Sequence, residues 1–143
     1  MQTNTTETLN EIVRGEISAL ETYDQVLEKV GDDPRAAELR SLRSDHEEAV
    51  SVFSQHVEVR GDDADKDSGA WGTFAKTVAG TAKIFGDTAA LKALKEGEEH
   101  GLNQYNRALD DDIDPQVKRM IQDTYIPRQQ AHINAIDGLM SRM

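Results

Sequence analysis

The chain contains no cysteine among its 143 residues. This absence excludes disulfide bonds, thiolate metal sites, iron–sulfur clusters and cysteine nucleophiles. Proline and aromatic residues are also scarce, with 3 prolines and an aromatic content of 5%. No apolar run approaches the roughly 20 residues that a membrane-spanning helix needs, and the polar N-terminus lacks the apolar segment of a signal peptide. We therefore expect a cytoplasmic protein without a membrane span.

Basic residues are also fewer than acidic ones. The chain has 16 Lys and Arg residues against 27 Asp and Glu residues, so its net charge is −11. Phosphates would be repelled by an acidic field of this size, and we expect no nucleic-acid partner. The length suits one hydrophobic core but not two, so we predict a single domain over residues 1–143.

What the sequence does contain is a set of apolar stripes with helical steps of three and four residues. The glycine-rich stretch over residues 71–85 has the same apolar spacing and predicts a short, weak helix. Residues 1–8 are polar, and we expect them to be mobile. Pro127 lies inside the last stripe and should kink its helix. The predicted helices span residues 9–30, 35–60, 71–85, 88–111 and 115–141.

The spacing of these helices predicts an all-α four-helix bundle of two antiparallel hairpins, because no segment has a strand pattern. Gly31 with Asp33-Pro34 indicates a tight first turn, whereas about 25 residues from Gly61 to Gly86 separate the hairpins. That length suits a crossover along the bundle with its own short helix outside. The Trp71–Phe85 stripe either packs on the bundle, forms a homo-dimer or protein-partner surface, or touches membranes through its lysines.

The two hairpins share the pattern G-E-x-x-x-L-x-x-Y-x-x-[VA]-L at an offset of 82 residues. In each half a glutamate on the apolar stripe is followed by a tyrosine two turns later, at Glu16 with Tyr23 and at Glu98 with Tyr105. The match indicates a duplicated hairpin.

Four polar residues stand where the stripes call for apolar side chains: Glu16, His46, Glu98 and His132. A buried carboxylate must be paired, protonated or bound to a metal. Two glutamates and two histidines that converge in a core are suitable ligands for Fe, Mn or Zn. Tyr23 and Tyr105 could hydrogen-bond to such ligands.

A bundle with a crossover and with a glutamate seven residues before a tyrosine on its first helix resembles the ferritin-like superfamily. The stretch SGAWGTFAKTVAGTAKIFG, followed by ALKALKEGEEHG, is similar to small single-bundle bacterial ferritin-like proteins described as a domain of unknown function. Bacterioferritins and rubrerythrins carry one glutamate on the first and third helices and Glu-x-x-His on the second and fourth. The resemblance covers roughly residues 9–140 and implies the fold, a metal site and a link to stress or metal homeostasis.

Carried over residue by residue, the resemblance matches Glu16 and Glu98 to the terminal glutamates, and His46 and His132 to the histidines. Three residues before each histidine, where the family has bridging glutamates, this chain has Arg43 and Gln129. Arginine cannot bind a metal ion, and a di-iron centre needs bridging carboxylates. What the resemblance leaves is a single-metal site.

The competing interpretation is a buried polar layer that sets helix register. Each helical residue rises 1.5 Å, so the number of residues from a turn gives the height of a side chain along the bundle. By this count Glu16 lies level with His46, and Glu98 lies level with Arg128 unless the Pro127 kink shifts the register. Glu98 would then pair with Arg128, and Glu16 with His46 or Arg43. Two functions stay open: a metal-binding bundle, and a non-catalytic interaction or stress-related structural protein. We assign no catalytic residue, because no Ser/His/Asp set or phosphate-binding glycine loop is present.

Overall fold

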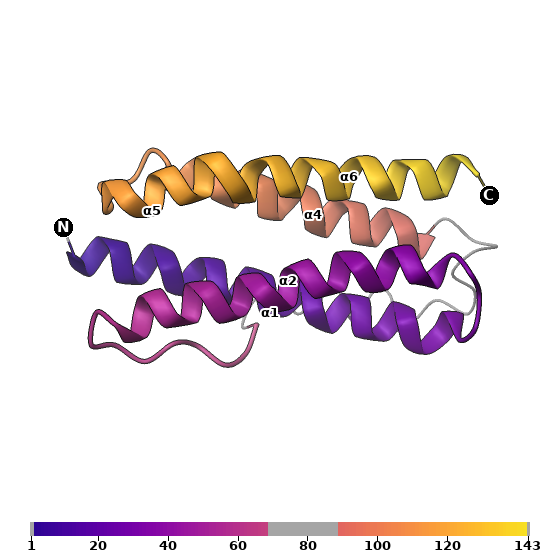
Figure 1. Cartoon of the computed structure of the whole chain (residues 1–143), viewed down its shortest axis with the longest axis horizontal. Coiled ribbons are helices and arrows are strands. Elements are labelled where there is room, and N and C mark those ends of the chain that lie inside the picture. Colours follow the sequence, from indigo (N-terminus) through magenta and orange to yellow (C-terminus); the bar gives the residue numbers. More distant parts are fainter. Residues whose placement is uncertain (1, 69–88, 143) are drawn as a thin grey trace.

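The computed structural model describes residues 2–68 and 89–142, and all regular structure in these residues is helical. The predicted all-α class is thus confirmed for them, whereas the predicted helix at 71–85, with its dimer surface, lies outside the described residues. Helical rods lie side by side along one axis (Figure 1). They are α1 (Gln2–Val30), α2 (Ala36–Glu58), α4 (Ala89–Ala108) and a continuous rod of α5 (Pro115–Met120), η2 (Ile121–Tyr125) and α6 (Ile126–Ser141).

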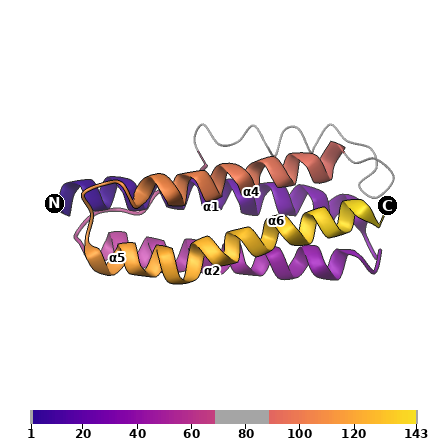
Figure 2. The same cartoon turned by 90° about the horizontal axis from the view of Figure 1, so that it is seen from above.

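The rods form two antiparallel hairpins, α1 with α2 and α4 with the α5–α6 rod (Figures 1 and 2). α2 ends near the N-terminus of the chain, whereas α4 begins at the opposite end of the bundle, beside the turn between α1 and α2. As a result α1 runs antiparallel to both of the helices that it packs against, α2 and α4. No helix in the described ranges is long and apolar enough to cross a membrane.

The turn between α1 and α2 has a local cause in the sequence. Gly31 has a φ of 56°, a left-handed conformation in which glycine is strongly favoured, and α1 ends just before it. The carboxylate of Asp33 then accepts a hydrogen bond from the backbone N–H of Arg35 at 2.9 Å. This short turn folds α2 back along α1.

α1 begins at Gln2, so the segment that we expected to be mobile is helical from Gln2 onward. The Thr5 side chain is 1% exposed, and its hydroxyl accepts the backbone N–H of Asp114 at 3.0 Å. The Thr8 hydroxyl donates to the carboxylate of Asp111 at 3.0 Å. These long-range contacts fasten the start of α1 to the segment before α5, which the polar composition of residues 1–8 does not reveal.

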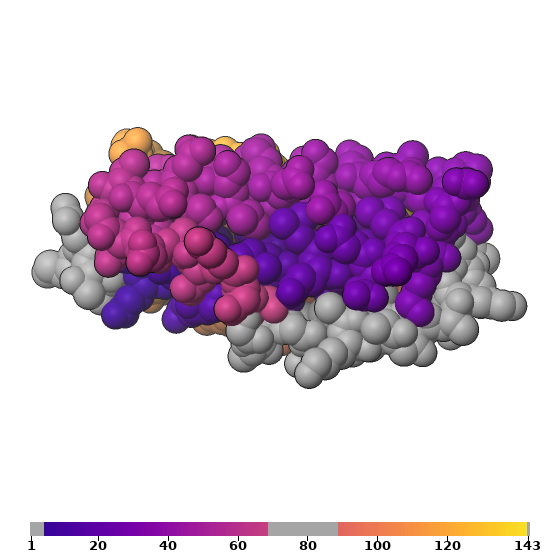
Figure 3. Space-filling model, turned by 90° about the horizontal axis from the view of Figure 1, so that it is seen from below, coloured from indigo at the N-terminus to yellow at the C-terminus, as the bar shows by residue number. Residues whose placement is uncertain are grey.

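Residues 59–68 leave α2 and turn back over α1 (Figure 3). Asn10 holds this segment from α1, because its side chain donates to the carbonyl of Asp63 at 3.2 Å and accepts from the backbone N–H of Asp65 at 3.0 Å. Arg14 forms an ion pair with Asp65.

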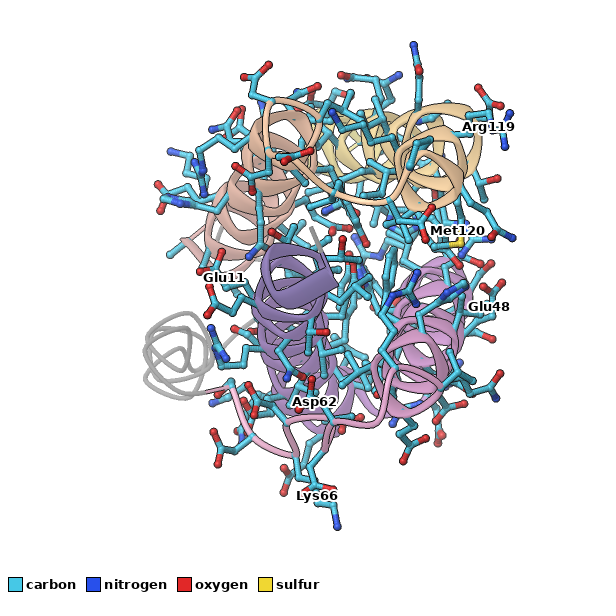
Figure 4. All side chains as sticks on the ribbon, turned by 90° about the vertical axis from the view of Figure 1, so that its left-hand side faces the viewer. Glu11, Glu48, Asp62, Lys66, Arg119 and Met120 are labelled. Atoms are coloured by element: carbon cyan, nitrogen blue, oxygen red, sulfur yellow. The ribbon has the colours of Figure 1, made fainter. Side chains whose placement is uncertain are left out.

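Among the described residues, the core consists of two apolar clusters at opposite ends of the bundle. Figure 4, an end-on view, shows the rods around a centre filled with side chains. One cluster contains Leu9, Ile12, Val13, Ala49, Phe53, Val57, Tyr105, Ala108, Ile113, Val117, Ile121 and Tyr125. The other contains Tyr23, Val26, Leu39, Leu42, Ala90, Leu91, Ala93, Leu94, Ile136 and Leu139.

Candidate metal centre

A layer of buried polar side chains lies between the two apolar clusters. α1, α2, α4 and α6 contribute Glu16, His46, Glu98 and His132, which are 5%, 2%, 2% and 2% exposed. The structure therefore brings together all four of the residues predicted as ligands. Side chains that can carry charge are stable at such a depth only when they are paired or neutralised by a bound cation.

Glu98 is the centre of this layer, because both histidines face its carboxylate. Its Oε1 atom lies 2.8 Å from Nε2 of His46, and its Oε2 atom lies 3.0 Å from Nδ1 of His132. Neither nitrogen has a hydrogen-bond partner of acceptable geometry among the described residues. One ligand atom from each residue falls within 4.8 Å of the other two, so the three side chains could hold a metal ion.

The opposite nitrogen of each histidine ring is held by a second carboxylate. Nδ1 of His46 lies 2.5 Å from Oε2 of Glu16, and Nε2 of His132 lies 2.8 Å from Oδ2 of Asp45. A neutral imidazole that donates its N–H to such a carboxylate carries its lone pair on the other nitrogen. Both lone pairs then point at Glu98, an arrangement that needs a shared cation or added protons.

Tyrosine hydroxyls link the two glutamates across the α1–α4 interface. Tyr23 on α1 donates to Oε2 of Glu98 at 2.9 Å, and Tyr105 on α4 donates to Oε1 of Glu16 at 2.5 Å. The repeated Glu–Tyr pattern of the sequence thus becomes a reciprocal exchange of hydrogen bonds. Gln129 completes the setting of Glu98, because its Nε2 donates to Oε1 at 2.8 Å and to the backbone carbonyl at 2.9 Å.

The charges of the layer shift its acid–base equilibria in opposite directions. Burial opposes the charged form of Glu98, but the neighbouring His46 and His132 outweigh it and lower the pKa of the carboxyl to about 2. Burial also opposes protonation of His46, yet Glu98 and Glu16 raise the pKa of its ring well above its ordinary value. Burial, with the adjacent carboxylate, raises the pKa of the Tyr23 and Tyr105 hydroxyls. Without a metal the layer is therefore held by a protonated His46 beside ionised Glu98.

The two arginines predicted as substitute partners lie outside this layer. Arg43 forms ion pairs with Asp24 at 2.6 Å and Glu47 at 3.1 Å. Arg128 pairs with Glu48 at 3.0 Å, at the edge of the bundle in Figure 4. Neither of the pairings that we expected for these arginines, with Glu16 or with Glu98, is present.

His132 and not Arg128 is level with Glu98 because the second turn is built unlike the first. α4 ends at Ala108, and six irregular residues, 109–114, carry the chain past that point before α5 starts (Figure 2). Irregular residues rise by up to about 3.3 Å each, against 1.5 Å in a helix. In η2 the N–H of Ile126 bonds to the carbonyl of Ile121, a π-helical turn that absorbs one more residue just before Pro127.

Sequence reasoning did not identify the contacts of Asp45 and Glu48. Asp45 is half-exposed and precedes His46, so it looks like a residue of the solvated face, and only the packing of α2 against α6 shows that it meets His132. Glu48 is exposed on α2, yet it accepts hydrogen bonds from Tyr125 and Arg128, each at 3.0 Å. The spacing of apolar residues along one helix does not predict either contact, because each contact joins two different helices.

A small cavity adjoins the layer between α1 and α4. Its volume is about 20 Å³, and a water molecule needs at least ~10–15 Å³ of such space. A ligand the size of one water molecule fits in this cavity, and Glu98 is one of the residues that line it. The lining residues are mostly small: Gly15, Ser18, Ala19, Thr22, Tyr23, Leu94, Gly97 and Glu98.

A protein-family profile matches residues 4–111, and its family is described as a domain of unknown function, DUF2383. The matched region includes Glu16, His46 and Glu98 but ends before His132. No curated protein and no solved structure matches the chain. The comparisons therefore identify a family without assigning an activity.

Proposed function

Because the chain belongs to the DUF2383 family, whose description assigns no function, we propose from the geometry of the site that this protein binds one divalent transition metal ion. His46 Nε2, His132 Nδ1 and the Glu98 carboxylate are the ligands. One observation carries the proposal: two histidine nitrogens without hydrogen-bond partners face a single buried carboxylate. Imidazole and carboxylate ligands suit Fe, Mn or Zn.

The charge of the layer supports a divalent ion. Neutral histidines leave two buried carboxylates, Glu16 and Glu98, whose charge of −2 a divalent cation balances. When the histidines are neutral, Glu16 and Asp45 accept their outer N–H groups, which leaves the lone pairs on the inner nitrogens. Such carboxylate–histidine pairs are a recurring support of metal sites.

Hydrogen bonds around the glutamates favour one ion over two. Tyr23 and Gln129 each donate to one oxygen of Glu98, and the remaining direction of each oxygen faces a histidine. Both oxygens of Glu16 are engaged, by His46 and Tyr105. Gln129 is neutral, so it offers no negative charge that would balance a second metal ion. When bound, the ion would supply Lewis acidity toward a small ligand, for which the neighbouring cavity has room.

We also infer that the bundle is of the ferritin-like type. The directions of the rods support this inference, since α2 ends and α4 begins at opposite ends of the bundle (Figure 1). The Glu–Tyr pairs on α1 and α4 support it as well. With Arg43 turned outward and Gln129 neutral, the bridging carboxylates of a di-iron centre are missing.

The test is metal uptake by chelator-treated protein. Titration with Fe(II), Mn(II) or Zn(II), followed by elemental analysis, should give one ion per chain for at least one metal. At a free metal concentration of 100 times Kd, binding stabilises the fold by about 2.7 kcal/mol, which raises Tm by roughly 5–10 °C for a chain of this size.

The matched variants are His132→Ala and His100→Ala. His100 is exposed on α4, outside the layer, so its loss should leave both uptake and the metal-induced rise in Tm intact. His132→Ala should abolish both. Comparison of each variant with and without metal separates binding from any general loss of stability. Wild-type protein that takes up no metal, or a His132→Ala variant that binds like wild type, would contradict the proposal.

The second candidate is a non-catalytic interaction or structural protein whose buried polar layer fixes helix register. The reciprocal bonds from Tyr23 to Glu98 and from Tyr105 to Glu16 favour it, because they tie α1 to α4 without any ion. This candidate predicts no metal uptake, together with a metal-free bundle that depends strongly on Glu98.

A further inference from the structure

We propose that Gly101 is a positioning residue for the metal site, because the space beside its Cα allows Gln129 to hold the Glu98 carboxylate. The inference rests on the proposed function and adds to it a residue that touches no ligand atom. Gly101 lies three residues after Glu98 on α4, so both residues share one face of the helix.

The space at Gly101 is filled by the Gln129 amide. A Cβ atom placed on Gly101 would lie 2.6 Å from Nε2 of Gln129 and 3.4 Å from its Cδ. The first distance is far shorter than a van der Waals contact, so any side chain at this position displaces the amide. By contrast, a Cβ atom on Gly138 of α6 would meet nothing within 4 Å.

The amide cannot move away without loss. Gln129 is 4% exposed, and its Nε2 donates both to Oε1 of Glu98 and to the Glu98 backbone carbonyl. Displacement breaks both hydrogen bonds and leaves Oε1 without the donor that fixes its direction. The same oxygen faces His46 at 2.8 Å, so a turned carboxylate no longer presents its oxygens to the two histidines together.

Helix propensity runs against glycine at this position. Glycine is among the poorest helix formers, and alanine is the best. Gly101 lies in the interior of α4, and its φ is not positive, so alanine fits its backbone conformation. Gly101→Ala should therefore help the helix while it harms the site, and these opposite effects can be measured separately.

The experiment compares Gly101→Ala, Gln129→Ala and the double variant, with Gly138→Ala as the control. Zn(II) and Mn(II) affinities of the full chain are measured by calorimetric titration. We expect Gly101→Ala and Gln129→Ala to weaken binding by about tenfold or more, the size typical of lost support behind a ligand. Gly138→Ala should bind like wild type. The double variant should bind like Gln129→Ala alone, because Gly101 acts only through that amide.

Melts of the metal-free variants give a second readout. Gly101→Ala should lower Tm in the wild-type background, where the methyl group strikes the amide, and raise it in the Gln129→Ala background, where the amide is gone. Equal affinities of Gly101→Ala and wild type, or additive losses in the double variant, would overturn the inference while the metal site stands. Wild-type protein that binds no metal would overturn the proposed function, and this positioning role with it.

Discussion

Glu98→Gln is the substitution that best tests the electrostatics of the buried layer, and it can be studied without metal. Glutamine keeps the shape of the side chain but removes its charge. Burial opposes the ionised form of Glu98, but His46 and His132 together outweigh it and lower the pKa of the carboxyl from 4.5 to about 2. Since one pKa unit corresponds to about 1.4 kcal/mol, the ionised form contributes about 3 kcal/mol to the folded state at neutral pH.

The sign of the pH dependence follows from this depressed pKa. Above pH 4.5 the carboxyl is ionised in both the folded and unfolded chains, and the contribution is fully present. As the pH falls from 4.5 towards about 2, the unfolded chain takes up the proton first, and the contribution disappears. Wild-type protein should therefore lose its advantage over Glu98→Gln across this window.

The assay is urea unfolding of chelator-treated wild type and Glu98→Gln at several pH values between 2 and 7. At pH 7 the variant should be less stable by about 3 kcal/mol, which corresponds to a fall in Tm of roughly 10 °C. Near pH 2 the two proteins should converge. The many exposed carboxylates titrate in both proteins, so they cancel in the comparison. A difference that is absent at pH 7, or that persists unchanged at pH 2, would refute the assignment of His46 and Glu98 as a buried charge pair.

Three further predictions concern the hydrogen bonds around the proposed ligands and the backbone conformation of the first turn. Tyr23→Phe removes a hydrogen-bond donor from the proposed ligand Glu98 and should weaken metal binding about tenfold. Tyr105→Phe leaves all three proposed ligands untouched and should weaken metal binding less. Equal losses of affinity in calorimetric titration would contradict the ligand assignment. Asp45→Asn should also lower metal affinity by about tenfold, since it weakens the support of a ligand histidine, and an unchanged Kd would show that this support is dispensable. Gly31→Ala should cost about 1 kcal/mol in urea unfolding, and an unchanged midpoint would mean that the positive φ of 56° is not required.

Much of the helical pattern was predictable because it depends on local spacing. The apolar stripes that lie within residues 2–68 and 89–142 fall on helices, and Gly31 and Asp114 stand at helix ends where their backbone and capping chemistry place them. The four polar residues of the layer could be singled out for the same reason. Each of them interrupts a stripe most of whose other members lie in the two apolar clusters or pack against them.

The pairing of Glu16 with His46 was among those expected and is present, but the level of His132 could not be predicted, because it depends on how far one helix slides against another. Counting residues from a turn assumes that both helices end level with it. That assumption is wrong for the second hairpin, where α5 starts beyond the end of α4 and a π-helical turn follows. The count therefore placed Arg128, and not His132, level with Glu98 in the interpretation as a polar layer, unless the Pro127 kink shifted the register. The helical start of α1 was missed for a related reason, since Thr5 is anchored by residue 114 and not by its neighbours.

The same shift of register explains why the two similar hairpins share the one proposed metal centre and do not each have an equivalent one. At the repeat offset of 82, the counterpart of His46 is Arg128, and the second histidine comes four residues later. In both hairpins Nδ1 of the histidine faces the glutamate of its own hairpin, His46 with Glu16 and His132 with Glu98. The other nitrogens differ, because Nε2 of His46 reaches Glu98 while Nε2 of His132 turns to Asp45 at the edge of the bundle. Glu98 therefore receives both histidines, and Glu16 receives only one. The displaced second half thus brings two similar Glu–His pairs together as the single three-ligand set that we propose.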